Sequence, residues 1–141
     1  MTSLQLKVAM NLPYLIAVHR KDFSKILSLY EISKADINAS SNDGTSAIWL
    51  AAAKGYTDLV KLLGRLDANI NHCNLLGYTP LMIAANNNHC DTVLQLFELG
   101  ARVNEVNNKG ASSAVIAAKR GMRYCNITTC VDQRLFCACS L

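Results

Sequence analysis

Three glycines divide this chain into similar segments, because Gly44, Gly77 and Gly110 recur at equal intervals. Each glycine opens a version of one phrase, which reads GTSAIWLAA, then GYTPLMIAA, then GASSAVIAA. The same interval separates the members of two further sets, which are Asn38, Asn71 and Asn104, and Ala35, Ala68 and Ala101. A fixed period of this length is typical of a stack of small units rather than of one globular core. Such a stack has a long surface and few enclosed clefts, so we expect binding rather than catalysis.

Composition narrows the class of protein further. The chain has 141 residues, of which 51% are hydrophobic and 17% charged, which predicts one ordered, well-buried domain. The net charge of +4 is spread along the chain without a basic run, so no nucleic-acid partner is expected. The most apolar early segment, residues 8–18, is interrupted by Asn11 and Pro13, so neither a membrane span nor a signal peptide is expected. The six cysteines then predict free thiols in an intracellular, cytoplasmic protein, with the nucleus as a second compartment.

The clearest unit covers residues 74–106 and contains the signals of two short helices. Thr79 can cap a helix with its hydroxyl, and Pro80 follows at the first helical position, where its missing N–H costs nothing. The asparagines at 86–88 break this helix, because asparagine tolerates the left-handed conformation of a tight turn. A second helix is predicted over about residues 89–99.

These residues resemble the ankyrin repeat, whose pattern is Gly-x-Thr-Pro-Leu-His, Ala-Ala, a glycine turn, a Val/Leu-rich second helix and Gly-Ala-Asp-Val-Asn. Residues 74–106 match this pattern closely, with Met82 in place of the histidine that ties down the turn in the family. Residues 41–73 also fit, with Asp67 where glycine is usual. The resemblance covers about residues 12–121. It implies an all-α ankyrin-repeat solenoid of about four helix-turn-helix units with short hairpin loops.

The resemblance also divides the chain into an ankyrin-repeat domain at 1–121 and a divergent cap or tail at 122–141. The expected units are residues 7–40, 41–73, 74–106, and 107–121 and onward. The first unit is irregular, because the step from Ala17 to Ala51 is longer by one than the repeat period, and we place the extra residue between Lys21 and Ile26. The tail has polar residues and four cysteines where the family has a Val/Leu-rich helix. It is either a degenerate cap or a sequence that replaces further repeats.

The sequence contains no convincing catalytic, cofactor or metal motif. The spacing of the tail cysteines is not that of a zinc site, and the tail contains no histidine. The two Cys-His pairs, at 72–73 and 89–90, are sequence neighbours without a third, orienting group. The glycines recur at the repeat period and do not form a phosphate-binding loop. We therefore expect no catalytic residue, no cofactor and no metal.

The resemblance implies that a protein partner contacts the hairpin tips and the exposed side of the first helices. Carried over position by position, the binding residues are Asn42, Asp43, Thr45, Trp49, Ala53, Lys54, Leu75, Leu76, Tyr78, Met82, Asn86, Asn87, Asn108, Lys109, Ala111, Val115, Lys119 and Arg120. Leu75, Leu76 and Tyr78 are apolar at a tip where polar residues are usual. Trp49 and Met82 share one repeat position and are expected to form an exposed stripe. The alternative is that both fill the gap between hairpin and helix.

These observations predict a non-enzymatic, monomeric protein-protein interaction module. Its surface is ordered before the partner arrives, so docking loses little conformational entropy. The alternative is a regulatory or effector protein that acts through the divergent tail or a second module. In that hypothesis residues 12–13 open an F-box-like or host-targeting helix instead of the first repeat.

Overall fold

The computed structural model describes residues 13–31 and 36–121, and all structural statements concern these residues. Residues 13–19 are helical. The helices that follow are α2 (Phe23–Glu31), α3 (Ala47–Lys54), α4 (Thr57–Arg65), α5 (Pro80–Asn86), α6 (Cys90–Glu98) and α7 (Ser113–Lys119). Extended pairing within the described residues is limited to two isolated bridges, Ser40–Ser46 and Val106–Ser112. The predicted all-α repeat fold is therefore confirmed. None of the described helices is long and apolar enough to cross a membrane.

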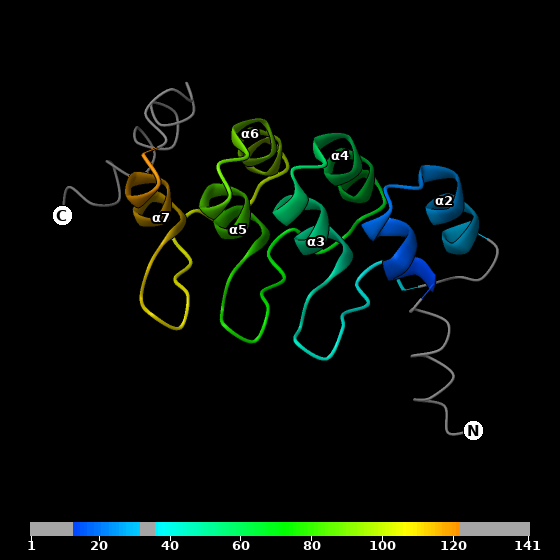
Figure 1. Cartoon of the computed structure of the whole chain (residues 1–141), viewed down its shortest axis with the longest axis horizontal. Coiled ribbons are helices and arrows are strands. Elements are labelled where there is room, and N and C mark those ends of the chain that lie inside the picture. Colours follow the sequence, from blue (N-terminus) through cyan, green and yellow to red (C-terminus); the bar gives the residue numbers. More distant parts are fainter. Residues whose placement is uncertain (1–12, 32–35, 122–141) are drawn as a thin grey trace.

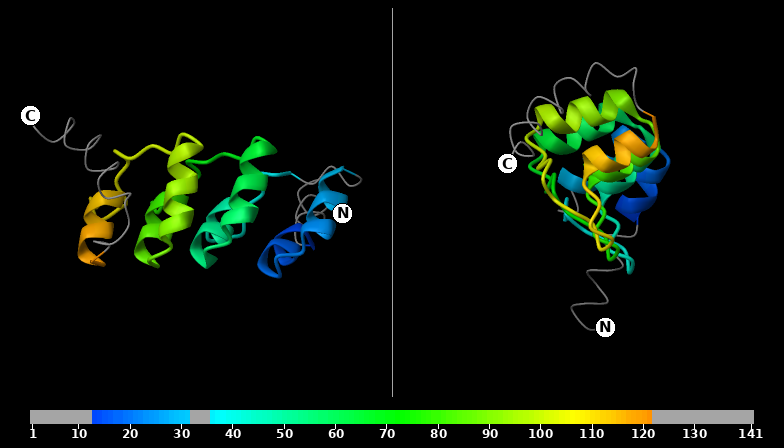
Figure 2. Two further views of the ribbon diagram at one scale, coloured as in Figure 1. Left: turned by 90° about the horizontal axis from the view of Figure 1, so that it is seen from above. Right: turned by 90° about the vertical axis from the view of Figure 1, so that its left-hand side faces the viewer.

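The helices form a two-layered stack with hairpins projecting from one side (Figure 1). Helix α5 packs between α3 and α7 in the inner layer, and α4 packs against α6 in the outer layer. Viewed along the stack, the hairpins overlie one another at one edge of the molecule (Figure 2, right). The core lies between the layers, where Ile48, Leu59, Leu63, Leu81 and Leu96 are almost completely buried. Neighbouring units therefore share one continuous core, as the repeat period predicts.

The inner helices begin with the same cap in all three units. The hydroxyl oxygens of Ser46, Thr79 and Ser112 each accept the backbone N–H three residues further on, at 3.2–3.4 Å. Each hydroxyl satisfies one of the N–H groups that lack a partner at a helix start. Helix α5 also has Pro80 in its first turn. The cap expected at Thr79 is therefore confirmed, and serine forms the same cap in the flanking units.

Two polar residues adopt the left-handed backbone conformation that the sequence suggested. Asn88 follows α5 with φ 62°, and Asp67 follows α4 with φ 62°. Asparagine and aspartate tolerate this region better than other residues with a Cβ atom. Both turns reverse the chain between packed elements, so they keep each unit compact.

The irregularity of the first unit lies at a different place from the one expected. Lys21 and Gly55 both have left-handed φ values, 57° and 72°, and the step between them is already longer by one than the repeat period. The same longer step separates the first residues of α2 and α4. The expected insertion at 21–26 is therefore wrong, because the longer step is kept from the first to the last residues of α2 and α4. The extra residue lies between Glu31 and Asn38, since Asn38 and Asn71 are again separated by the normal period.

The expected cap or tail at 122–141 lies outside the described residues.

Candidate functional site

The three hairpins end in turns of the same geometry. Each turn is closed by a hydrogen bond of 2.9–3.0 Å from a glycine N–H to the carbonyl three residues earlier. The central residue pairs of the three turns are Asn42–Asp43, Leu75–Leu76 and Asn108–Lys109. Because the hairpins project side by side from the stack (Figure 1), the three pairs form a row. We call this row of six residues the tip row.

Asparagine side chains support the second and third turns from within. The Asn74 Oδ1 atom accepts the N–H groups of Leu76 and Tyr78 at 3.1 and 3.0 Å. The Asn107 Oδ1 atom accepts the N–H groups of Lys109 and Ala111 in the same way, at 2.9 and 3.0 Å. Side-chain bonds of this type replace backbone bonds that the turn cannot make.

The first turn has Ser41 at this position, and Asp43 takes over the supporting role. The Asp43 carboxylate accepts the Ser41 hydroxyl, and it accepts the Thr45 N–H at 3.1 Å. These hydrogen bonds, the Ser41 bond first, hold the pKa of Asp43 below its ordinary value. The first tip therefore carries a negative charge at neutral pH.

Backbone hydrogen bonds between hairpins hold the middle tip on both sides. Leu75 N–H donates to the Asp43 carbonyl at 3.0 Å, and Asn108 N–H donates to the Leu76 carbonyl at 3.1 Å. The Asn108 Nδ2 atom also donates to the Leu75 carbonyl at 2.9 Å. The tip row is therefore fixed by its own polar groups before any partner arrives.

Large apolar side chains are exposed on the middle tip. Leu75 and Leu76 are 71% and 63% exposed, and Val106, on the third hairpin, is 57% exposed. Exposed leucines on an ordered turn are costly to hydrate, and a group of exposed apolar side chains rimmed by polar residues marks an interaction site. Leu75 and Leu76 were predicted from the sequence, but Val106 was not. Its exposure could have been inferred from its place one repeat after Cys73, because both residues directly precede the asparagine that supports the turn.

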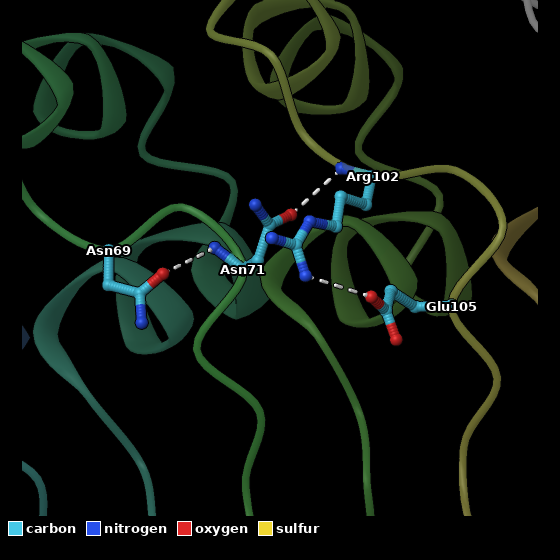
Figure 3. Close-up of polar contacts among 4 residues, drawn as sticks. All are labelled: Asn69, Asn71, Arg102 and Glu105. Carbon is cyan, nitrogen blue, oxygen red and sulfur yellow. Dashed lines mark hydrogen bonds and ion pairs between the residues drawn. The ribbon is translucent and has the colours of Figure 1, made fainter.

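A second set of asparagines links the bases of the hairpins. The Asn38 Oδ1 atom accepts Asn69 N–H at 2.7 Å, and the Asn71 Oδ1 atom accepts Arg102 N–H at 2.8 Å. Figure 3 shows Asn71 between Asn69 and Arg102, whose guanidinium pairs with Glu105 at 3.3 Å. Asn38 and Asn71, two of the three asparagines that recur at this position, therefore each join one unit to the next.

The exposed stripe expected from Trp49 and Met82 is wrong for Met82, which is buried. Met82 is only 1% exposed, because its side chain belongs to the core between neighbouring units. Trp49 is half-buried, and its Nε1–H donates to the Tyr78 carbonyl at 2.8 Å. Met82 therefore fills space in the core, whereas Trp49 keeps part of its surface exposed. Trp49 also links its unit to the next one.

The far ends of the inner helices are also linked from unit to unit. The Ala53 carbonyl accepts Asn87 Nδ2–H at 2.8 Å, and His89 Nε2 lies 3.0 Å from the same oxygen. The Asn86 Oδ1 atom accepts two N–H groups of Arg120, at 3.1 and 3.0 Å. These predicted binding residues therefore have a structural role in the free protein.

The other predicted positions lie at or near the surface. The exposed members of the predicted set are Asn42, Asp43, Leu75, Leu76, Asn87, Asn108, Lys109, Val115, Lys119 and Arg120. The half-buried members are Thr45, Trp49, Ala53, Lys54, Tyr78, Asn86 and Ala111. Among the exposed apolar members, Leu75 and Leu76 lie together on the middle tip, and Val115 lies apart from them on α7.

The histidines, cysteines and acidic residues of the described segments are dispersed. These segments contain no cluster of three or more histidine, cysteine or acidic side chains that could hold a metal ion. His72 Nε2 lies 3.0 Å from the Gly44 carbonyl, so this ring joins two hairpins. Cys73 is a free, exposed thiol.

One buried polar atom stands apart from these networks. The Tyr14 hydroxyl is fully buried and has no hydrogen-bond partner among the described residues. Burial raises the pKa of Tyr14 above its ordinary value, and the nearby Asp36 and Tyr30 raise it further. The phenol therefore stays neutral, and its ring packs in the core of the first unit.

Comparison with known families agrees with this architecture. A family model described as ankyrin repeats (three copies) matches residues 14–107. The chain therefore belongs to the ankyrin-repeat family, whose members generally act as protein-protein interaction modules. No curated protein matches the chain.

Proposed function

We propose that this chain is a non-enzymatic module that binds a partner protein through the tip row, with Leu75 and Leu76 at the centre of the contact. The observation that carries the proposal is the exposure of these two leucines, 71% and 63%, on a turn held from both sides. Burial of such side chains against a partner is favourable at about 25 cal/mol per Å² of apolar surface. Asp43, Asn108 and Lys109 form a polar rim around them, as is usual for interfaces.

The mechanism of binding in this proposal is pre-organisation. The middle turn is fixed by Asn74 within its own hairpin and by Asp43 and Asn108 from the two neighbouring hairpins. A partner therefore meets side chains whose backbone is already ordered, and the entropy lost on docking is small. Lys54, Lys119 and Arg120 lie at the opposite ends of the inner helices from the hairpins, so they do not belong to this rim.

The test is a comparison of two leucine variants. We expect the double substitution Leu75→Ser and Leu76→Ser to weaken partner binding by about 2–4 kcal/mol, because both central apolar contacts are lost. Leu94→Ser is the matched control, since Leu94 is 38% exposed on α6, away from the hairpins. Partners are recovered by affinity capture with the wild type, purified, and measured by calorimetry against both variants. Equal affinity of the double variant and the wild type would remove the tip row from the proposal.

The proposal includes a monomer in the cytoplasm or nucleus, with no nucleic acid or membrane as partner. The free thiol of Cys73 and the scattered charges support it. Differential alkylation of cysteines in intact cells, followed by mass spectrometry, measures their oxidation state directly. Sedimentation of the purified chain measures its oligomeric state. Of the alternative modules, the F-box-like helix opens at residues 12–13, directly before the ankyrin-repeat match that begins at residue 14, and the tail at 122–141 lies outside the described residues.

A further inference from the structure

The three tips differ in chemistry at one repeat position. The second central residue of the turns is Asp43, then Leu76, then Lys109, each one repeat after the last. The residues before them are Asn42, Leu75 and Asn108. Along the stack, the tip row therefore presents an acidic group, an apolar pair and a basic group, in that order (Figure 1).

Both end charges are available to a partner. The Asp43 carboxylate is bonded to Ser41 and Thr45, which are neutral groups, so its charge is not compensated there. Lys109 is exposed, and its backbone N–H donates to Asn107 Oδ1. The ion pair found among the described residues, Arg102–Glu105, involves neither of them.

The spacing of the tips fits an extended peptide. Neighbouring packed helices lie about 8–10 Å apart, and α3, α5 and α7 pack side by side, so adjacent tips are separated by a similar step. A chain in the extended polyproline II conformation advances about 3.1 Å per residue with three residues per turn, so about three residues span one step. A peptide lying along the row in this conformation therefore turns every third side chain toward a tip.

We propose that the tip row binds an extended segment of the partner protein with a cationic, an apolar and an acidic side chain at intervals of three residues. The cation lies over Asp43, the apolar side chain against Leu75 and Leu76, and the acid over Lys109. This inference rests on the proposed function and adds the chemistry of the partner segment. The leucines supply the contact area, and the exposed charges select the order of side chains more than they add affinity. An anionic membrane surface fits the row poorly, because Asp43 repels it.

The test is a selection of peptides that bind the full chain. A random twelve-residue library is selected against the wild type, against Asp43→Lys and against Lys109→Glu. We expect wild-type binders to carry an apolar residue with a cation three residues to one side and an acid three residues to the other. Asp43→Lys should select acids on both sides, and Lys109→Glu should select cations on both sides. These changes do not depend on the direction in which a peptide binds.

Two milder variants keep the turns intact and remove only the charges. Asp43→Asn retains an oxygen for the Thr45 N–H, and Lys109→Gln leaves the backbone bond to Asn107 in place. Each should weaken the binding of a wild-type-selected peptide by about two- to fivefold in fluorescence anisotropy, with unchanged melting by circular dichroism.

The same charge pattern in peptides selected by all three proteins, or no enrichment by the wild type, would overturn the inference. If peptides depend on the leucines but not on the charges, the inference fails and the proposed function stands. If they depend on neither, both fail.

Discussion

The second and third hairpins have the same turn but different surroundings. Gly77 and Gly110 have nearly equal φ values, 79° and 77°. A Cβ atom added at Gly77 would lie 2.7 Å from Asn108 Oδ1 and 2.9 Å from Asn108 N. A Cβ atom added at Gly110 would meet nothing within 4 Å among the described residues. The sequence of each unit therefore specifies its own turn, whereas close packing requires the next unit.

The inner helices show the same difference. Ala85 in α5 is 1% exposed, and Ala118, at the same position in α7, is exposed. In repeat proteins, stability is roughly the sum of each unit's own stability and the interfaces between nearest neighbours. Identical residues should therefore have different effects on stability in the middle and at the end of the described stack.

The largest expected difference concerns the alanines of the inner helices. We predict that Ala85→Leu lowers the free energy of unfolding by about 3 kcal/mol, because the close-packed inner layer lacks room for three more carbons. Ala118→Leu should change it by less than about 0.5 kcal/mol, as surface substitutions usually do. Urea unfolding of both variants measures the difference. Equal losses would show that α7 is packed as tightly as α5.

The glycines of the turns should differ less. Gly77→Ala combines the cost of a left-handed alanine with a clash against the backbone of the next hairpin, and we predict a loss of about 2–3 kcal/mol. Gly110→Ala has the conformational cost alone, about 1 kcal/mol. The two φ values are equal within a few degrees, so the difference in thermal unfolding isolates the clash. A difference close to zero would contradict the close approach at Gly77.

The smallest of these differences concerns the asparagines at the hairpin bases. Asn71→Ala removes the acceptor of Arg102 N–H, and we predict a loss of about 1 kcal/mol. Asn104→Ala is the control one repeat later, at an exposed position, and should be nearly neutral. Chemical denaturation of the two variants side by side sharpens the comparison. A neutral Asn71→Ala would mean that water replaces this bond at no cost.

Features with local causes could be predicted from the sequence. The cap at Thr79 depends on residues within one turn of helix, and the left-handed conformations of Asn88 and Asp67 depend on the residue itself. The repeat period then predicted the fold, because identical units stack in one way. The apolar tip at Leu75 and Leu76 was also visible, since leucine is unusual at the centre of a turn.

Features that depend on the neighbouring unit could not be predicted in this way. The burial of Met82 and the bond from Trp49 to the Tyr78 carbonyl both form between units, and the partners of that bond are far apart in the sequence. Side-chain type alone therefore suggested that Trp49 and Met82 are exposed together, whereas Met82 is buried and Trp49 is bonded to the next hairpin. The bonds between Arg120 and Asn86 and between Asn87 and the Ala53 carbonyl were missed for the same reason.

Amide hydrogen exchange, measured by NMR on the full chain, tests most directly whether each unit fixes the next. Leu75 and Asn108 donate their N–H groups to the preceding hairpin, whereas the N–H of Asn42, at the same position in the first turn, donates no bond among the described residues. We predict that the amides of Leu75 and Asn108 exchange at least about a hundredfold more slowly than that of Asn42, after correction for intrinsic rates. Equal rates at the three positions would show that the hairpins move independently and would contradict the account of a tip row ordered in advance.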